Sequence, residues 1–301
     1  MQQVPKEVQK LLAEREKLRE QKRYKESDEA RKRIEALGYE VTDEKEGARV
    51  SKKDEYVAPK ESFLVLFGSG ETAPSAVKTH DFVFNRIGKD KPSIVVISTP
   101  AGFQPNVKVV CEEIADFFER HLKNYHPRIE IVYANTREQA NEPKLIQPLN
   151  EADYIFTGPG SPTYAVRHLQ GSLLYEKIVE RVRSGASLGL ASAAVMAFSK
   201  FTLPVYEIYK AGFPLYWEPG LNLYSLIFRE LVVVSHFNNN EGGKKNDTSR
   251  AWMGRERFEK LFAMLPLTQK VWGIDEHTAV LFDLKTKQVR SMGKGKLWKL
   301  R

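Results

Sequence analysis

The chain has 301 residues, which allows one large domain or two smaller ones. Hydrophobic residues make up 42% of it, and its longest apolar runs are strand-sized, which excludes a disordered chain and a membrane-spanning one. The net charge of +8 permits a polyanionic partner but does not identify one. The charged N-terminus is no secretory signal, and the single cysteine, Cys111, excludes an intramolecular disulfide and a multi-cysteine metal site. We therefore expect a soluble, cytoplasmic protein without a metal or cofactor.

Charge is concentrated in the first part of the chain. Residues 1–60 hold 16 Lys+Arg and 14 Asp+Glu, so half of this segment is charged, against under a quarter of the remainder. The change predicts a polar N-terminal unit over residues 1–55, a linker over 56–61 that contains Pro59, and a globular body over 62–301.

Two helical patterns occupy the N-terminal unit. The first runs from Pro5, which suits a first helical position, to about residue 22. Tyr24 interrupts the pattern, and a second helix is expected over about 25–37, before Gly38, which suits a helix C-terminus. The apolar faces are formed by Val8, Leu11, Leu12, Leu18, Ala30, Ile34 and Leu37. The patterns predict an antiparallel helical hairpin with a small core, for which a spacer or dimerisation role is the simplest interpretation.

The residues of this unit add a second interpretation. An arginine-rich first helix, Tyr24, an S-D-x-x-R centre in the second helix, a closing glycine and a V-x-D-x-x-x-G-x-R extension follow one another over about 8–53. This run resembles the C-terminal tail of cysteinyl-tRNA synthetase, which recognises the tRNA anticodon. A helical hairpin of an excision-repair nuclease subunit is a weaker match, because it lacks the extension.

The resemblance implies a tRNA partner, with Arg19, Tyr24, Asp28 and Asp43 as the candidate contacts. An aromatic ring can stack on a loop base, and carboxylates and arginine suit base edges and phosphate. The family commonly has tryptophan where this chain has Tyr24, and stacking survives that change. The ATP-binding motifs of the synthetase are absent, so the chain does not charge a tRNA.

Strand and helix signals alternate along the body. Most strand candidates are continuous apolar runs, as expected for strands buried on both faces. They cover residues 62–68, 93–98, 128–133, 153–157, 186–191, 231–235, 270–275 and 278–283. Helices are expected over about 74–87, 106–124, 163–169, 173–184, 192–199 and 249–263. The pattern predicts an α/β fold with a mostly parallel sheet and helices on both faces.

Two glycine-rich segments follow predicted strands, where ligands bind in such sheets. Residues 66–71 read LFGSGE, and residues 156–163 read FTGPGSPT. Exposed amides in the second segment can stabilise an oxyanion. Either segment is equally well explained as a structural turn.

A serine stands where a strand of small residues passes directly into a helix. Ser192 is followed by Ala193 and Ala194 and preceded by Ala191. A nucleophile elbow needs small neighbours, because it lifts the serine on a strained turn. A serine that only caps the helix is the alternative.

A histidine and two carboxylates also follow strands. His236 ends a very hydrophobic strand, where a buried charge is costly and a functional imidazole is favoured. Asp275 and Glu276 follow the strand over 270–275. A serine hydroxyl needs a base for its proton, and the base needs an acid to fix its tautomer. The other histidines look like surface or packing residues.

Five segments of the body match a known pattern in order: GSGE, ISTPAG, GPGSPTY, ASAAVM followed by LPVYEIYKAG, and SHF with GIDEHTA. Over about 62–285 they resemble the peptidase E and cyanophycinase branch of serine hydrolases, within the class I glutamine amidotransferase-like superfamily of flavodoxin-like folds. The resemblance implies Ser192 as nucleophile, His236 as base and Glu276 as acid, with Asp275 as fallback. It also implies an oxyanion hole formed by the amides of Gly160 and Ala193.

Some positions depart from this family. Leu190 and Ala194 stand where glycine is usual, and residues 238–248 form a polar segment after His236. One hypothesis is a serine peptidase or amidohydrolase of a small, acidic or β-aspartyl peptide, with Arg250, Arg255 and Arg257 available for a carboxylate. The alternative is a catalytically inactive scaffold that serves as a tRNA-binding or translation-associated factor.

Overall fold

The computed structural model describes residues 4–37, 39–44, 47–52, 61–226 and 231–301. The chain divides into two compact units, Met1–Ala58 and Pro59–Arg301, which we call the N-terminal unit and the body. Gly38 and nearly all of the predicted linker lie outside the described residues. In the described part of the chain, no helix is long and apolar enough to cross a membrane.

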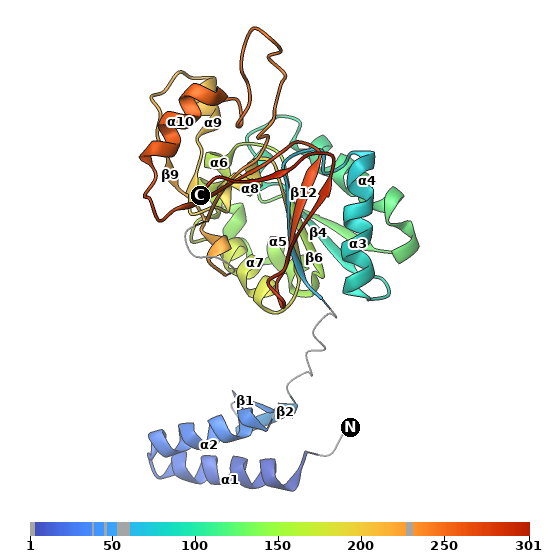
Figure 1. The fold of residues 1–301 in the computed structure, drawn as a ribbon. Helices are drawn as coiled ribbons and strands as arrows, with labels where there is room; N and C mark the ends of the chain where they lie inside the picture. The colour runs from blue at the N-terminus through green and yellow to red at the C-terminus, as the bar shows by residue number, and fades with distance from the viewer. Residues whose placement is uncertain (1–3, 38, 45–46, 53–60, 227–230) are drawn as a thin grey trace. The chain divides into compact units, whose positions relative to one another are not determined.

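The N-terminal unit contains a helical pair and a β-ribbon (Figure 1). Helices α1 (Lys6–Glu20) and α2 (Tyr24–Ala36) are joined by a short turn in which Lys22 has a φ of 60°. Strands β1 (Tyr39–Glu44) and β2 (Gly47–Lys52) pair in antiparallel fashion. The buried core of the unit is formed by Val8, Leu11, Ile34 and Val41. The helical pair agrees with the sequence pattern, but the prediction of a hairpin alone missed the ribbon.

The body is built on a seven-stranded sheet in the order β13-β12-β3-β7-β6-β4-β5. Strands β3, β7, β6, β4 and β5 are parallel, β12 is antiparallel to β3, and β13 is antiparallel to β12, so β13 runs in the same direction as the five parallel strands. The bounds are β3 Phe63–Phe67, β4 Ser93–Ile97, β5 Arg128–Val132, β6 Tyr154–Thr157, β7 Ser187–Ala191, β12 Thr278–Asp283 and β13 Val289–Gly293. The predicted α/β fold with a mostly parallel sheet is confirmed.

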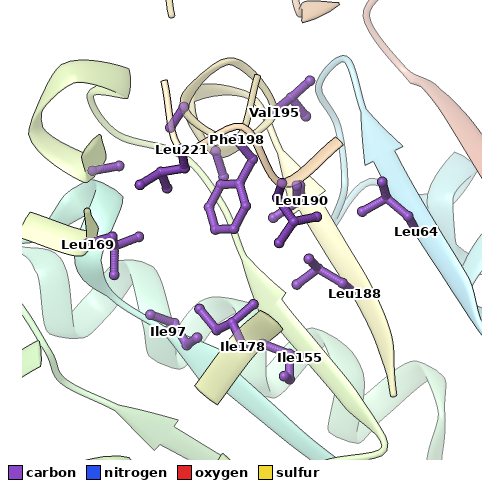
Figure 2. Packing of buried hydrophobic residues seen from close by; sticks show 14 of the residues in the cluster. Leu64, Ile97, Ile155, Leu169, Ile178, Leu188, Leu190, Val195, Phe198 and Leu221 are labelled. Carbon is purple, nitrogen blue, oxygen red and sulfur yellow. The ribbon is translucent and has the colours of Figure 1, made fainter. Parts of the chain in front are cut away.

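Helices cover both faces of this sheet (Figure 1). Because side chains alternate along a strand, Phe63, Val65 and Phe67 of β3 face one core, whereas Leu64 and Leu66 face the other. The first core is closed by α3 (Val77–Ile87) and α4 (Val107–His121). The second, seen in Figure 2, is closed by α5 (Pro143–Ile146), α6 (Pro162–Leu169) and α7 (Leu173–Arg183).

A second, smaller sheet lies beside the first, with strands in the order β10-β11-β14. Its strands are β10 (Leu231–Val234), β11 (Lys270–Ile274) and β14 (Leu297–Lys299). Strands β10 and β11 share a core with α8 (Ala193–Ala197), α9 (Val205–Tyr209) and α10 (Gly254–Met264). The sequence pattern did not separate β10 and β11 from the main sheet, because their residues are equally apolar.

The remaining elements are short. The strands β8 (Phe201–Thr202) and β9 (Glu218–Pro219) pair with each other. The 3-10 turns are η1 Pro74–Ala76, η2 Thr99–Ala101, η3 Lys123–Tyr125, η4 Gln139–Asn141, η5 Gln147–Glu151 and η6 Leu223–Leu226.

Candidate active site

Ser192 lies at the junction of β7 and α8, at the carboxyl edge of the main sheet. Its φ of 52° and ψ of −113° are rare for a residue with a side chain. Two hydrogen bonds hold this conformation: the Ser192 N–H donates to the Phe67 carbonyl over 3.1 Å, and Ser235 Oγ donates to the Ser192 carbonyl over 3.0 Å. The strained turn has the geometry of a nucleophile elbow.

The two departures at the elbow point away from the hydroxyl. Leu190 and Ala194 are fully buried members of the core seen in Figure 2, where Leu190 lies near Val195 and Phe198. Neither is among the described residues that line the pocket beside Ser192. The larger side chains therefore fill the core beneath the turn and leave the space above Ser192 open.

His236 accepts or donates a hydrogen bond on each side of its ring. Its Nε2 lies 2.8 Å from Ser192 Oγ, and its Nδ1 lies 2.8 Å from Glu276 Oε1. Its backbone has a φ of 51°, and its N–H donates to the Gly68 carbonyl over 3.1 Å. The side chain is 12% exposed, so the ring is largely shielded from water.

Glu276 is held in place by two asparagines. Asn239 Nδ2 donates to Glu276 Oε1 over 2.9 Å, and the Glu276 N–H donates to Asn238 Oδ1 over 2.7 Å. The hydrogen bond from His236 is the main cause that lowers the pKa of Glu276. The carboxyl group is therefore ionised at neutral pH and can only accept.

The carboxylate of Asp275 accepts hydrogen bonds from the C-terminal segment. Its Oδ2 accepts from the Lys296 N–H over 2.9 Å, and its Oδ1 accepts from Trp298 Nε1 over 2.8 Å. Both carboxylate oxygens thus anchor the segment that leads into β14. Of the two acids that the sequence offers, Glu276 is the one that contacts His236.

The end of β3 joins these parts. The carbonyl groups of Phe67 and Gly68 accept from the N–H groups of Ser192 and His236, and the Gly68 N–H donates to the Thr278 carbonyl over 2.9 Å. A Cβ at Gly68 would lie 2.1 Å from the Asp275 carbonyl oxygen. The glycine of the GSGE segment therefore lets three chain segments meet, and its role is structural.

Gly160 and Ala193 line the same pocket as Ser192 and His236. The Ala193 N–H begins α8, and first-turn N–H groups have no partner within their own helix. Gly160 has a φ of 145°, and a Cβ there would lie 1.9 Å from the Pro100 carbonyl oxygen. Only glycine fits this backbone at the edge of the pocket.

The three arginines considered for a carboxylate do not line this pocket in the described part of the chain. Arg250 donates to Ser249 Oγ over 2.6 Å and lies over the ring of Phe237. Arg257 donates to the carbonyls of Trp252 and Met253. Arg255 is exposed on the first turn of α10.

A larger pocket, of about 460 Å³, is lined by Phe237, Arg250 and Asp275 among other residues. It includes neither Ser192 nor His236 among its described lining residues. The pocket beside Ser192 is smaller, at about 290 Å³, but it holds the reactive side chains. The side chains in its lining, rather than its volume, make the smaller pocket the candidate active site.

Cys111 lies away from the pocket beside Ser192 and is not among its described lining residues. Cys111 is buried in α4, where burial raises the pKa of its thiol to about 12. A thiol in this state is a packing residue. In the ranges that the structure describes, no cluster of three or more His, Cys, Asp or Glu residues is placed to hold a metal ion.

Sequence reasoning missed two residues of the site, Asn239 and Trp252. Asn239 was only part of a polar segment, and nothing in its spacing indicated a contact with Glu276. The ring of Trp252 lies 4.8 Å from that of His236 between ring centres. The available signal for Trp252 was a tryptophan between two arginines in the sequence S-R-A-W-M-G-R, shortly after His236.

Three of the four candidate RNA contacts lie on the helical pair. Tyr24 begins α2 and is 57% exposed, and Arg19 and Asp28 are also exposed. Asp43 lies on β1 opposite Ala48, and its side chain is outside the described residues. The extension seen in the sequence is therefore the β-ribbon.

Comparisons with known proteins bear on each unit separately. Residues 1–50 match the family described as the cysteinyl-tRNA ligase anticodon binding domain. This confirms the resemblance of the N-terminal unit to the synthetase tail. None of the curated proteins matches the chain in sequence.

The body resembles solved peptidase structures. A peptidase from an acI-B1 actinobacterium has a TM-score of 0.59 and 20% identity, covering 81% of this chain and 98% of its own. A provisionally named peptidase E protein from Listeria monocytogenes EGD-e has a TM-score of 0.51 and 15% identity. The match covers 78% of this chain and 100% of the Listeria chain. The resemblance of the body to peptidase E is confirmed at the level of the fold.

Proposed function

We propose that the body is a serine hydrolase of small peptides, with Ser192 as nucleophile, His236 as general base and Glu276 as the orienting acid. The observation that carries the proposal is the chain of two 2.8 Å hydrogen bonds that joins these side chains. The strained backbone of Ser192 supports it, because such strain persists where the surrounding structure holds a reactive group in place. The peptidase folds of the neighbours agree with it.

The proton path follows from Glu276. Because this carboxylate only accepts, His236 Nδ1 carries the ring proton and Nε2 is free to accept from Ser192 Oγ. As the oxygen attacks the scissile carbonyl carbon, Nε2 takes its proton, and Glu276 stabilises the imidazolium. Nε2 then returns the proton to the leaving amine.

The developing oxyanion needs donors already in place. The amides of Gly160 and Ala193 are our candidates, because both residues line the pocket with Ser192. Preorganised donors at this position typically contribute about 10²–10³ in rate each. Water then attacks the acyl-enzyme with His236 acting again as base.

Labelling with a fluorophosphonate serine probe tests the proposal. Wild-type protein should be labelled at Ser192, as located by mass spectrometry, and Ser192→Ala should not be labelled. The variant should keep the wild-type unfolding temperature, since only a hydroxyl is lost. Equal labelling of both proteins, or of neither, would favour the alternative of a catalytically inactive scaffold.

For the N-terminal unit we propose tRNA binding. The match to the anticodon binding domain supports it, and so does the exposed ring of Tyr24 at the start of α2. Filter binding of the full chain to a tRNA with a GCA anticodon, against a tRNA with another anticodon, tests it. Absence of any discrimination would leave the unit as a spacer or dimerisation element.

A further inference from the structure

The pocket beside Ser192 has mainly apolar walls. Its described lining consists of Gln104, Pro159, Gly160, Pro162, Ser192, Ala193, Met196, Val205, Tyr206, Tyr209, Lys210, His236, Glu241 and Trp252. Its volume of about 290 Å³ is near the lower end of the roughly 300–1,000 Å³ typical of small-molecule sites. The pocket therefore suits one side chain next to the scissile bond.

Three aromatic rings form much of the wall. Tyr206 and Tyr209 come from α9, and Trp252 comes from the segment before α10. Trp252 Nε1 donates to Glu241 Oε2 over 3.1 Å, which fixes the plane of the indole. The ring stands beside His236, at 4.8 Å between ring centres. A group bound against Trp252 thus lies next to the reacting atoms.

The charges of the lining nearly cancel. Lys210 and Glu241 are the charged side chains among the described lining residues, and they have opposite signs. Lys210 is exposed, with Nζ 5.2 Å from the ring centre of Tyr209. An acidic substrate side chain would lose its hydration on entering the pocket. The attraction of Lys210 would be opposed by the repulsion of Glu241, so the free-energy cost of this desolvation would not be offset.

The apolar surface continues outside the pocket. Tyr206 is 40% exposed and Phe103 is 44% exposed, and their ring centres lie 5.9 Å apart. Exposed apolar groups that gather at a cleft indicate a binding surface. The exposed rings at the mouth of the pocket and the apolar wall inside it therefore both favour an apolar group.

We infer that this pocket selects a large apolar, preferably aromatic, side chain on the acyl side of the scissile bond, and that Trp252 determines this specificity. The inference rests on the proposed function of Ser192. It replaces the acidic or β-aspartyl substrate hypothesised from the sequence, because none of the three arginines is among the described lining residues of the pocket, and Arg250 and Arg257 have other contacts.

Two diphenyl aminophosphonates test the inference on the full chain, one with a benzyl and one with a carboxymethyl side chain. Ser192 Oγ attacks phosphorus, a P–O bond to the protein forms, and phenoxide leaves and takes the proton from His236. The reaction needs no turnover, so its second-order rate constant reports side-chain preference directly. Mass spectrometry verifies the adduct on Ser192.

The benzyl compound should react at least about tenfold faster, since an apolar pocket discriminates by about 10–200-fold for each methylene-sized difference. Trp252→Ala should reduce this ratio several-fold, whereas Trp252→Phe should preserve it. A change in the position of His236 alters both rates equally and leaves the ratio unchanged. Tyr209→Ala gives an independent loss of aromatic wall if Trp252→Ala does not fold.

Equal rates, or a faster carboxymethyl compound, would overturn the inference. So would a benzyl preference that survives both Trp252→Ala and Tyr209→Ala. If the wild-type protein reacts faster with the carboxymethyl compound, and Lys210→Met slows that reaction selectively, the hypothesis of an acidic substrate holds instead.

The test separates this inference from the proposed function. A protein whose Ser192 reacts with a fluorophosphonate but with neither aminophosphonate is a serine hydrolase that lacks the inferred pocket preference. A protein that reacts with none of the three compounds contradicts the proposed function itself.

Discussion

At the scale of residues, left-handed backbone angles gather around Ser192. Positive φ values occur at Ser192, His236, Arg250, Ala251, Trp252 and His277. Each such residue costs of order 1–3 kcal/mol and persists only where neighbours hold it. The bonds from Arg250 N–H to the Phe237 carbonyl and from Ala251 N–H to the His236 carbonyl supply this restraint. Other described residues with a positive φ, such as Lys22 and Lys91, lie elsewhere in the chain, so this group is the part of the backbone strain that adjoins the proposed chemistry.

Replacing each acid separately tests the assignment of Glu276. Glu276→Gln removes the charge that stabilises the imidazolium and should lower kcat, though less than His236→Ala, which removes the base itself. Asp275→Asn should leave kcat near wild type. It should lower the free energy of unfolding by about 1–3 kcal/mol, because its amide nitrogen would face a donor, either Lys296 N–H or Trp298 Nε1.

Steady-state kinetics and chemical denaturation of the three variants measure both effects. A severe loss of kcat in Asp275→Asn with a silent Glu276→Gln would reverse the roles of the two acids.

At the scale of elements, helix α3 is attached to the sheet by a buried histidine. His80 stacks on Phe67 and its Nε2 lies 3.0 Å from the Glu71 carbonyl oxygen. Rings of Phe117, Phe118, Tyr154 and Phe156 also surround it. Burial lowers the pKa of His80 from 6.5 to about 4.

This shift predicts a pH-dependent stability. Between pH 6.5 and about 4 the unfolded chain binds a proton that the folded chain does not, so the free energy of unfolding decreases as the pH falls through this range. The full contribution is on the order of 3 kcal/mol. Denaturation at pH 7.5 and 4.5 should show a smaller loss in His80→Gln than in wild type.

The exposed His121 provides the matched control. His121→Gln should lose as much stability between the two pH values as wild type does. An equal loss in His80→Gln would mean that carboxyl groups alone cause the acid sensitivity.

Helix α2 carries the second element-scale prediction. Tyr24→Ala should weaken tRNA binding by about 1–3 kcal/mol, the usual contribution of a base–aromatic stack. Lys25→Ala should weaken all tRNAs about equally and flatten the salt dependence, because lysine displaces counterions from phosphate. Filter binding over a salt series measures both, and wild-type affinity in Tyr24→Ala would show that the ring only closes the turn.

The sequence predicted those elements whose pattern is local. Strand signals located six of the seven strands of the main sheet and missed β13, whose residues are mostly exposed. The residues that follow the predicted strands included Ser192, His236 and Glu276. Assignment of β10 and β11 to a second sheet depends on pairing with β14, which has only three residues and no distinctive pattern. The ribbon was missed because the sequences of its strands, YEVTDE and GARVSK, are mostly polar. Trp252 and Asn239 reach the site through loop geometry, which residue spacing does not encode.

At the scale of the whole molecule, each unit has its own core. The buried cluster of the N-terminal unit contains residues up to Val41, and the three clusters of the body contain residues from Phe63 onward. All the proposed catalytic and pocket residues belong to the body, and all the candidate RNA contacts belong to the N-terminal unit. The two proposed activities therefore rest on separate sets of packed residues.

Removal of residues 1–58 should separate the activities. The shortened chain should react with the fluorophosphonate at Ser192 within about twofold of the wild-type rate, because no described residue of the N-terminal unit lines the pocket. Its affinity for tRNA should fall to a weak, nonspecific level. Conversely, Ser192→Ala in the full chain should bind tRNA as wild type does. A labelling rate that drops tenfold on truncation, or that changes when tRNA is added to the full chain, would instead reveal coupling between the two sites.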